Sequence, residues 1–240
     1  MPTLNKIRTA TPWGRGSAAV DPIVRRLRVA LTLFFALDGF IFAGWVVRIP
    51  AIKERTGAST GALGLALLGV SAGAVATMVL TGRLCQRHGH QPVTVAAAVL
   101  MSLGVALPPH ATSALSLGLV LLVFGAGYGG LNVAMNSTAV DLVAALRRPV
   151  MPAFHAAYSL GGMVGAGLGG LLAGHLTVTT HLTALTAVGL ALSLGAGRTL
   201  LAHPVPSRPG TDRPPHGAPA AGAGSAGSAG SAGSAGSAGS

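Results

Sequence analysis

The sequence predicts an all-α membrane protein with six transmembrane helices, arranged as one half of a transporter fold. Half of its 240 residues are hydrophobic and only 9% are charged, whereas a soluble domain carries about 25% charged residues. No charged side chain occurs between Arg87 and Asp141 or between Arg148 and Arg198. Each of these intervals is long enough for two membrane spans joined by a polar turn. The 36 glycines are typical of transmembrane helices that pack closely.

The boundaries of the spans follow from the apolar runs and from the residues that interrupt them. Pro50 is expected to end the first helix, because a proline disfavours helical structure at the residue before it. A loop to Ser59 should follow it, and a tight loop is expected over residues 82–90. The six expected helices are 29–47, 62–81, 92–107, 114–136 with an amphipathic extension to 146, 152–174 and 182–201.

The basic residues predict a multi-pass protein of the cell's inner membrane with both termini in the cytoplasm. If the N-terminus lies inside, thirteen of the sixteen Lys and Arg residues fall in inner segments, as the positive-inside rule requires. The net charge of +11 does not indicate nucleic-acid binding, because the basic residues form short clusters between apolar runs with few aromatics. The lipid bilayer and its anionic head groups are the expected partners instead.

Three parts are expected along the chain: a basic cytoplasmic tail (1–28), a six-helix domain (29–201) and a disordered tail rich in Pro, Gly, Ser and Ala (202–240). The first apolar run lacks a small-x-small cleavage site, so it is interpreted as a retained signal anchor, with an Arg-rich transit peptide as the alternative. The Gly-Ser-Ala repeat predicts a flexible linker. Natural low complexity, a frameshift product and an engineered tail all fit it.

Asp38 is the sharpest single signal of function. It lies in the middle of the first span, where a carboxylate costs a few kcal/mol to insert. It is therefore expected to face the interior of the bundle, either paired or protonated. One interpretation is a carboxylate that couples proton movement or binds substrate, and the alternative is a structural acid held by a neighbouring helix.

Four further polar residues are candidates for a substrate or proton pathway. Asn132 and Asn136 share one face of the fourth span because they are four residues apart. His155 and Tyr158 likewise share one face of the fifth span, at a depth that would let His155 face Asn132 across the hairpin. The alternative is simple interhelical hydrogen bonding, worth about 0.6 kcal/mol.

A column of glycines on the fifth span predicts a helix-packing face. Gly161, Gly165 and Gly169 recur at intervals of four and allow near backbone contact with another helix. Cys85 is the only cysteine, which excludes an internal disulfide and a cysteine-based metal motif. We expect no metal and no cofactor.

Two short matches to enzyme motifs are set aside. Residues 125–130 fit G-x-G-x-x-G, but the apolar run before them is a membrane span rather than a short strand. Residues 69–73 fit G-x-S-x-G, and an intramembrane hydrolase would need His155 to activate Ser71 from a different depth. The protein is therefore not expected to be an enzyme.

The segment Gly82–His90 (GRLCQRHGH) is similar to the G-x-L-a-D-r-x-G-r signature of the major facilitator superfamily of transporters. The match holds at Gly82, Leu84, Arg87 and Gly89, and Gln86 stands where the family has an acid. The resemblance implies a gating loop whose functional residues are Gly82, Arg83, Arg87 and Gly89.

Three more segments resemble the YbjJ-type branch, which is related to sugar–proton symporters of the fucose-permease kind. They are residues 45–52 (WVVRIPAI), 132–136 (NVAMN) and 148–155 (RPVMPAFH). In those symporters an acid in the first helix carries the proton, and Asp38 is the matching residue by position. An acid often precedes V-A-M-N in the branch, and Asn132 stands there in this chain.

The resemblance covers about residues 31–201 and implies the N-terminal half of a twelve-span fold, with substrate bound between two halves. It implies proton-coupled symport of a small-molecule substrate by alternating access. Six spans are expected to act as a half-transporter, either as a homodimer or with a separate second half, or to represent a truncated form. The alternative is a non-transporting membrane remnant or a partner-binding scaffold.

Overall fold

The computed structural model describes residues 22–205, and within this range all regular structure is helical. Six helical segments are long and apolar enough to cross a membrane, which confirms the predicted fold class. The expected tails lie outside the described residues, apart from residues 22–28 and 202–205. The elements are α1 (Pro22–Val46), α2 (Ile49–Thr56), α3 (Thr60–His88), α4 (His90–Gly104), η1 (Pro108–His110), α5 (Ala114–Leu146), α6 (Met151–Ala173) and α7 (Val178–Ala202).

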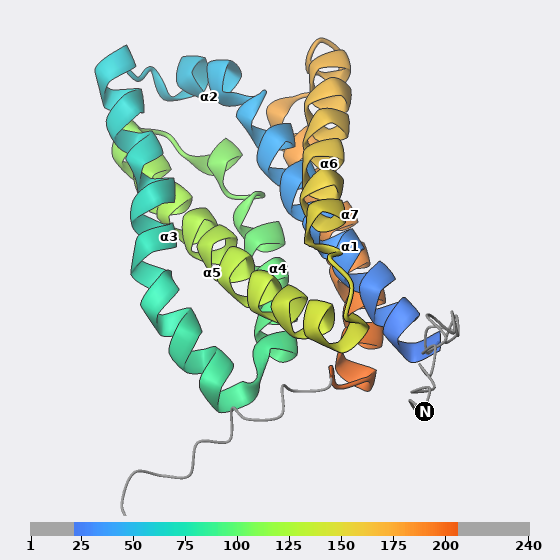
Figure 1. Cartoon of the computed structure of the whole chain (residues 1–240). Coiled ribbons are helices and arrows are strands. Elements are labelled where there is room, and N and C mark those ends of the chain that lie inside the picture. The colour runs from blue at the N-terminus through green and yellow to red at the C-terminus, as the bar shows by residue number, and fades with distance from the viewer. Residues whose placement is uncertain (1–21, 206–240) are drawn as a thin grey trace, which may run out of the picture. The chain divides into compact units, whose positions relative to one another are not determined.

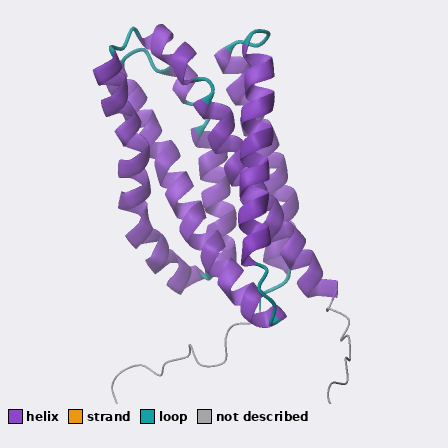
Figure 2. Ribbon diagram, turned by 45° about the horizontal axis from the view of Figure 1, so that its top comes forward, coloured by secondary structure: helices purple, strands orange, loops and turns teal. Residues whose placement is uncertain are grey.

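The long helices form two close pairs, α3 with α5 and α1 with α6, and α4 and α7 join the two pairs (Figure 1). α3 packs mainly on α5, and α6 packs mainly on α1. α4 and α7 contact each other behind these pairs, and α1 also contacts α5 and α7. α3 and α6 are therefore the least buried spans of the bundle. Short loops at the two ends connect the helices (Figure 2).

Side-chain caps set where three of the long helices begin. The hydroxyls of Ser59, Ser113 and Thr177 each accept a hydrogen bond from a backbone N–H in the first turn of α3, α5 and α7. These bonds satisfy donors that have no partner inside the helix. At the other end of α5, Arg147 adopts a left-handed conformation with a φ of 50° and stops the helix.

Glycine makes the contact between α1 and α6 close enough for backbone to touch backbone. A Cβ atom at Gly161 would overlap the carbonyl of Ala36, and one at Gly165 would overlap the carbonyl of Phe40. Gly39 of α1 lies against the carbonyl of Tyr158 in the same way. In lipid, where apolar side chains gain nothing by leaving the solvent, this van der Waals contact is a main source of association.

The segment after the first span differs from the expected loop, because residues Ile49–Thr56 form helix α2. Pro50 stands in the first turn of this helix, where a missing N–H costs nothing and the fixed φ of proline suits a helix. Pro50 therefore starts a second helix as well as ending the first. Gly57, with a φ of 61°, closes α2.

The expected tight loop over residues 82–90 is also corrected. α3 continues to His88, and α4 begins at His90. Gly89 alone breaks the helix, with a φ of 86° that favours glycine. Residues 83–88 contain no glycine or proline, so nothing interrupts the hydrogen bonding of the last turns of α3.

Candidate functional site

Asp38 lies completely buried on α1, as the sequence predicts. Its Oδ2 accepts a hydrogen bond of 3.0 Å from Nδ2 of Asn132 on α5. Its Oδ1 is buried without a hydrogen-bond partner among residues 22–205, and no Lys, Arg or His in that range forms an ion pair with it. The carboxyl group therefore has one oxygen left for a proton or for a donor group on a solute.

Asn132 connects this carboxyl group to the backbone of its own helix. The same Nδ2 that bonds Asp38 also donates to the carbonyl of Tyr128, at 3.1 Å. Both N–H groups of the amide are thus committed, which fixes the amide plane. Asn136 forms no hydrogen bond with Asp38 in the described residues; its amide donates to the carbonyl of Asn132 at 2.7 Å.

Tyr128 belongs to this cluster although the sequence analysis did not single it out. Its hydroxyl lies 3.5 Å from the hydroxyl of Tyr158 on α6, and its ring stacks on Phe42 of α1 at 4.9 Å between centroids. Tyr128 and Asn132 are four residues apart and so share a helix face. That spacing is the signal that would have identified it.

His155 and Asn132 are not joined by a hydrogen bond in the described residues. The ring of His155 is exposed and meets Phe35 of α1 edge-on, with centroids 5.7 Å apart. α6 packs on α1 and hardly touches α5, its neighbour in the sequence. α1, the helix that carries Asp38, contacts both of them.

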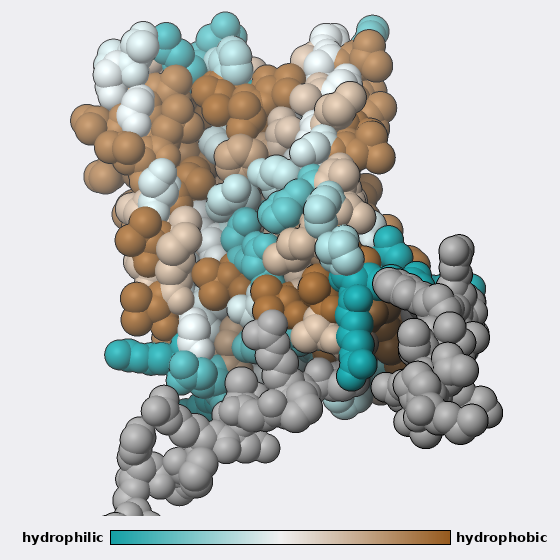
Figure 3. All heavy atoms as spheres, in the orientation of Figure 1, coloured by the Kyte–Doolittle hydropathy of each residue, from teal (hydrophilic) through white to brown (hydrophobic). Residues whose placement is uncertain are grey.

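Hydrophilic surface gathers on one face of the bundle. In Figure 3 hydrophilic residues occupy the middle of the face between α3 and α6, with apolar surface on either side. Asn132, Asn136 and Tyr158 are partly exposed, and His155 is exposed. Polar side chains at membrane depth are expected to face protein or water rather than lipid.

The residues of the segment that resembles the family signature form the junction between α3 and α4. Gly82, Arg83 and Arg87 lie on the last turns of α3, and Gly89 separates the two helices. The side chains of both arginines are exposed and make no ion pair with another described residue.

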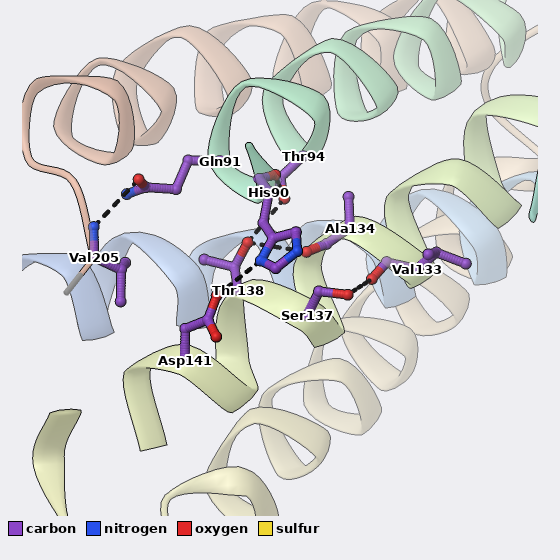
Figure 4. A network of polar contacts seen from close by, with 9 residues as sticks. All are labelled: His90, Gln91, Thr94, Val133, Ala134, Ser137, Thr138, Asp141 and Val205. Atoms are coloured by element: carbon purple, nitrogen blue, oxygen red, sulfur yellow. Dashed lines mark hydrogen bonds and ion pairs between the residues drawn. The ribbon is translucent and has the colours of Figure 1, made fainter. Parts of the chain in front are cut away.

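A polar cluster missed by the sequence analysis lies next to this junction (Figure 4). Nδ1 of His90 is 2.7 Å from Oδ2 of Asp141, which ties the start of α4 to the end of α5. One turn deeper the hydroxyls of Thr94 and Thr138 are 3.3 Å apart. Gln91 binds the end of α7 by donating to the carbonyls of Leu200 and His203, and its Oε1 accepts from the N–H of Val205.

At the opposite end of the bundle Arg48 is a buried charge with a structural role. It donates hydrogen bonds to the carbonyls of Leu172 and Ala173, in the last turn of α6, and to that of Leu176 just beyond it. Burial lowers the pKa of the Arg48 guanidinium below its usual value. The negative end of the helix dipole favours a cation at this position.

No group of three or more His, Cys, Asp or Glu side chains within residues 22–205 could hold a metal ion. The functional groups of the site are the carboxyl group of Asp38, the amides of Asn132 and Asn136, and the phenols of Tyr128 and Tyr158.

Comparison with known proteins identifies the family to which this chain belongs. Residues 29–233 match the family described as Major Facilitator Superfamily. An uncharacterized MFS-type transporter of Yersinia pestis is 35% identical over 184 residues, which cover 76% of this chain and 48% of the relative. The uncharacterized transporter y4wD of Sinorhizobium fredii (strain NBRC 101917 / NGR234) is 32% identical over 166 residues, or 69% of this chain and 40% of the relative.

The crystal structure of the nucleoside transporter NupG shares the fold with a TM-score of 0.59 at 15% identity, over 77% of this chain and 44% of that one. This chain thus spans about half the length of the relatives it matches. The superfamily resemblance is confirmed, and because the family is one of transporters, so is the prediction that the chain is not an enzyme.

Proposed function

Since this chain belongs to the Major Facilitator Superfamily, we propose that it takes part in the proton-coupled movement of a small solute by alternating access. The observation that carries the proposal is the carboxyl group of Asp38, which is buried and has a single hydrogen bond within residues 22–205. An ionised carboxylate in this environment is costly, and binding one proton removes the charge. Such a group changes its preferred surroundings with its protonation state, as proton coupling requires.

The polar face supports a pathway to this carboxyl group. Asn132 bonds Asp38 and is itself partly exposed, so it links the buried acid to the surface between α3 and α6. Tyr158, His155 and Asn136 are also at least partly exposed and offer hydroxyl, imidazole and amide groups to a polar solute. The resemblance of three segments to the YbjJ-type branch favours sugars as the first solutes to test.

We propose that a second six-helix unit covers this face, either a second copy or another polypeptide segment. α3 and α6 flank the polar residues and expose large apolar side chains, including Leu65 (72%), Met163 (70%) and Leu171 (74%). In twelve-span transporters the substrate site lies between two such units near the bilayer midplane. A second unit would enclose the polar residues and leave only apolar surface for lipid.

Both ends of the six-helix unit are assigned to the cytoplasmic side of the cell membrane. The start of α1, the α3–α4 and α5–α6 junctions and the end of α7 share one end of the bundle (Figure 1). The arginines at this end are Arg25, Arg26, Arg28, Arg83, Arg87, Arg147, Arg148 and Arg198. Among the basic residues of the range 22–205, only Arg48, Lys53 and Arg55 lie at the other end, which is the distribution that the positive-inside rule describes.

The test is proton flux in vesicles that contain the purified chain. The mass of the protein in mild detergent is measured first, to establish whether twelve spans are present. A panel of sugars and nucleosides is then applied while internal pH is recorded. Asp38→Asn should abolish solute-driven proton flux, and Glu54→Gln, an exposed acid of α2, is the matched control. Equal coupling in both variants would contradict the assignment of Asp38.

A monomer that moves none of these solutes would favour the alternative, a non-transporting membrane protein that acts as a scaffold for a partner. Coexpression with the second half of a relative separates the two outcomes, because only a half-transporter would gain transport activity from it.

A further inference from the structure

A basic groove lies where the start of α1 meets the end of α7, away from Asp38 and the polar face. Its volume is about 610 Å³, and Arg25, Arg26 and Arg198 contribute three guanidinium groups to its lining. His203 lies beside them. Because α1 begins and α7 ends at the same end of the bundle, residues far apart in the sequence converge on one anion-binding surface.

The charge of this groove is not neutralised within the described residues. No acidic side chain lines it, and the ion pair between His90 and Asp141 is the only one within residues 22–205. The three arginines are exposed, and their side chains form no hydrogen bond with another residue of the range 22–205. Three guanidinium groups offer more N–H donors than the two oxygens of one carboxylate can accept, and guanidinium groups also bind phosphate oxygens in bidentate geometry. The groove therefore suits a phosphate.

The groove becomes apolar as it runs along α1 toward the membrane interior. Arg25, Val29 and Leu33 follow each other at intervals of four residues and line both the basic groove and a smaller hollow beside it. Leu33 then lines a third groove between α1, α6 and α7, which has a volume of about 290 Å³ and includes Phe40 and Leu192. At 1.5 Å per residue, the path from Arg25 to Phe40 spans roughly 22 Å along the helix.

We propose that this surface is a specific binding site for an anionic phospholipid. The phosphate head group lies among Arg25, Arg26 and Arg198, and one acyl chain follows the groove past Leu33 between α1 and α7. A free phosphate or a nucleotide would use the arginines but not the apolar path. Basic pockets between transmembrane helices on the cytoplasmic side are a recognised form of lipid site.

The test is lipid retention by the purified full-length chain, measured by native mass spectrometry. Phosphatidylglycerol and phosphatidylethanolamine with identical acyl chains are offered at equal concentration. The triple variant Arg25→Gln/Arg26→Gln/Arg198→Gln is compared with Arg83→Gln/Arg87→Gln/Arg148→Gln, which removes the same charge from the same end of the bundle. Size-exclusion profiles and helical content establish that both variants are folded.

We expect the wild type to retain phosphatidylglycerol in preference to phosphatidylethanolamine. In the triple variant at Arg25, Arg26 and Arg198, the amount of phosphatidylglycerol retained should fall roughly tenfold or more. The control variant should keep it to within about twofold. Equal losses in the two variants would mean diffuse attraction to the basic end of the bundle and would overturn the site. Failure of both variants to change retention would overturn it as well.

A competition arm distinguishes a lipid from a free phosphate. Glycerol phosphate carries the head-group charge without the acyl chains, so millimolar amounts should not displace phosphatidylglycerol. Displacement by these amounts would overturn the lipid assignment in favour of a phosphate site. None of these measurements depends on transport, so the lipid site and the proposed function can fail separately.

Discussion

The Nε–H of Arg48 donates a 2.8 Å hydrogen bond to Nδ1 of His181, and the two residues are separated by 133 positions in the sequence. Because Nδ1 accepts this bond, the imidazole is neutral and carries its proton on Nε2. Arg48 joins the end of α1 to α7 through His181 and to the end of α6 through three carbonyls. One guanidinium group thereby joins three helices at the end of the bundle that carries α2.

Replacing Arg48 should therefore destabilise the bundle more than any exposed basic residue does. Arg48→Lys keeps the charge but cannot bond an imidazole and three carbonyls at once, and we expect it to lose about 2 kcal/mol. Unfolding by sodium dodecyl sulfate, followed by circular dichroism, measures the change. Arg55→Lys, at an exposed position on α2 at the same end, is the control, and equal midpoints for the two variants would refute the role of Arg48.

The α1–α6 contact predicts a strong difference between two glycines of one helix. Gly165→Ala places a methyl group against the backbone carbonyl of Phe40 and should cost about 1–3 kcal/mol. Gly167→Ala meets no atom within 4 Å and should be neutral or stabilising, because alanine favours helix. The same detergent titration compares them. Identical midpoints would show that α1 and α6 do not approach as closely as described.

The bond between Asp38 and Asn132 predicts an energetic coupling between the two positions. Asn132→Ala removes the one described donor to Asp38 and should destabilise the protein, whereas in an Asp38→Ala background, which has no acceptor at this place, the same change should matter less. A double-mutant cycle on unfolding midpoints should give a coupling of about 1 kcal/mol.

Asn136→Ala serves as the control for that cycle, because the amide of Asn136 bonds the carbonyl of Asn132 in its own helix and not Asp38. Its effect should be the same in both backgrounds. Coupling as large for Asn136 as for Asn132 would mean that the effect travels through α5 as a whole and not through the hydrogen bond.

The contact between His90 and Asp141 should contribute little to stability and should depend on salt. The two side chains are 37% and 25% exposed, and pairs of this kind contribute about 0–1 kcal/mol. Asp141→Asn is expected to lower the free energy of unfolding by less than about 1 kcal/mol at low ionic strength, with a smaller loss at high salt. The same loss at both salt concentrations would indicate a hydrogen bond without an electrostatic contribution.

The sequence alone was sufficient to predict the number of spans and the burial of Asp38. Whether a segment enters the bilayer is decided by its own length and transfer free energy, and these are local properties that a sequence displays directly. The span through Asn132 to Asn136 and its amphipathic helical extension to Leu146 were also predicted, and both lie in α5. Asp38 was expected to face the interior because every other placement of a carboxyl group in a span is too costly.

The partners of these residues were decided by the tertiary structure. Asp38 meets Asn132 across 94 residues, and Arg48 meets His181 across 133. Such pairs depend on which helix faces press together, and this is set by glycine contacts such as that of Gly165 with Phe40. Prediction from local propensity was wrong about α2 and about the end of α3. Pro50 fits in the first turn of a helix, and Gly82 is tolerated inside one, so helical structure continues beyond each of them. The sequence therefore determined which segments enter the membrane, and the packing of one helix on another determined which polar groups meet inside it.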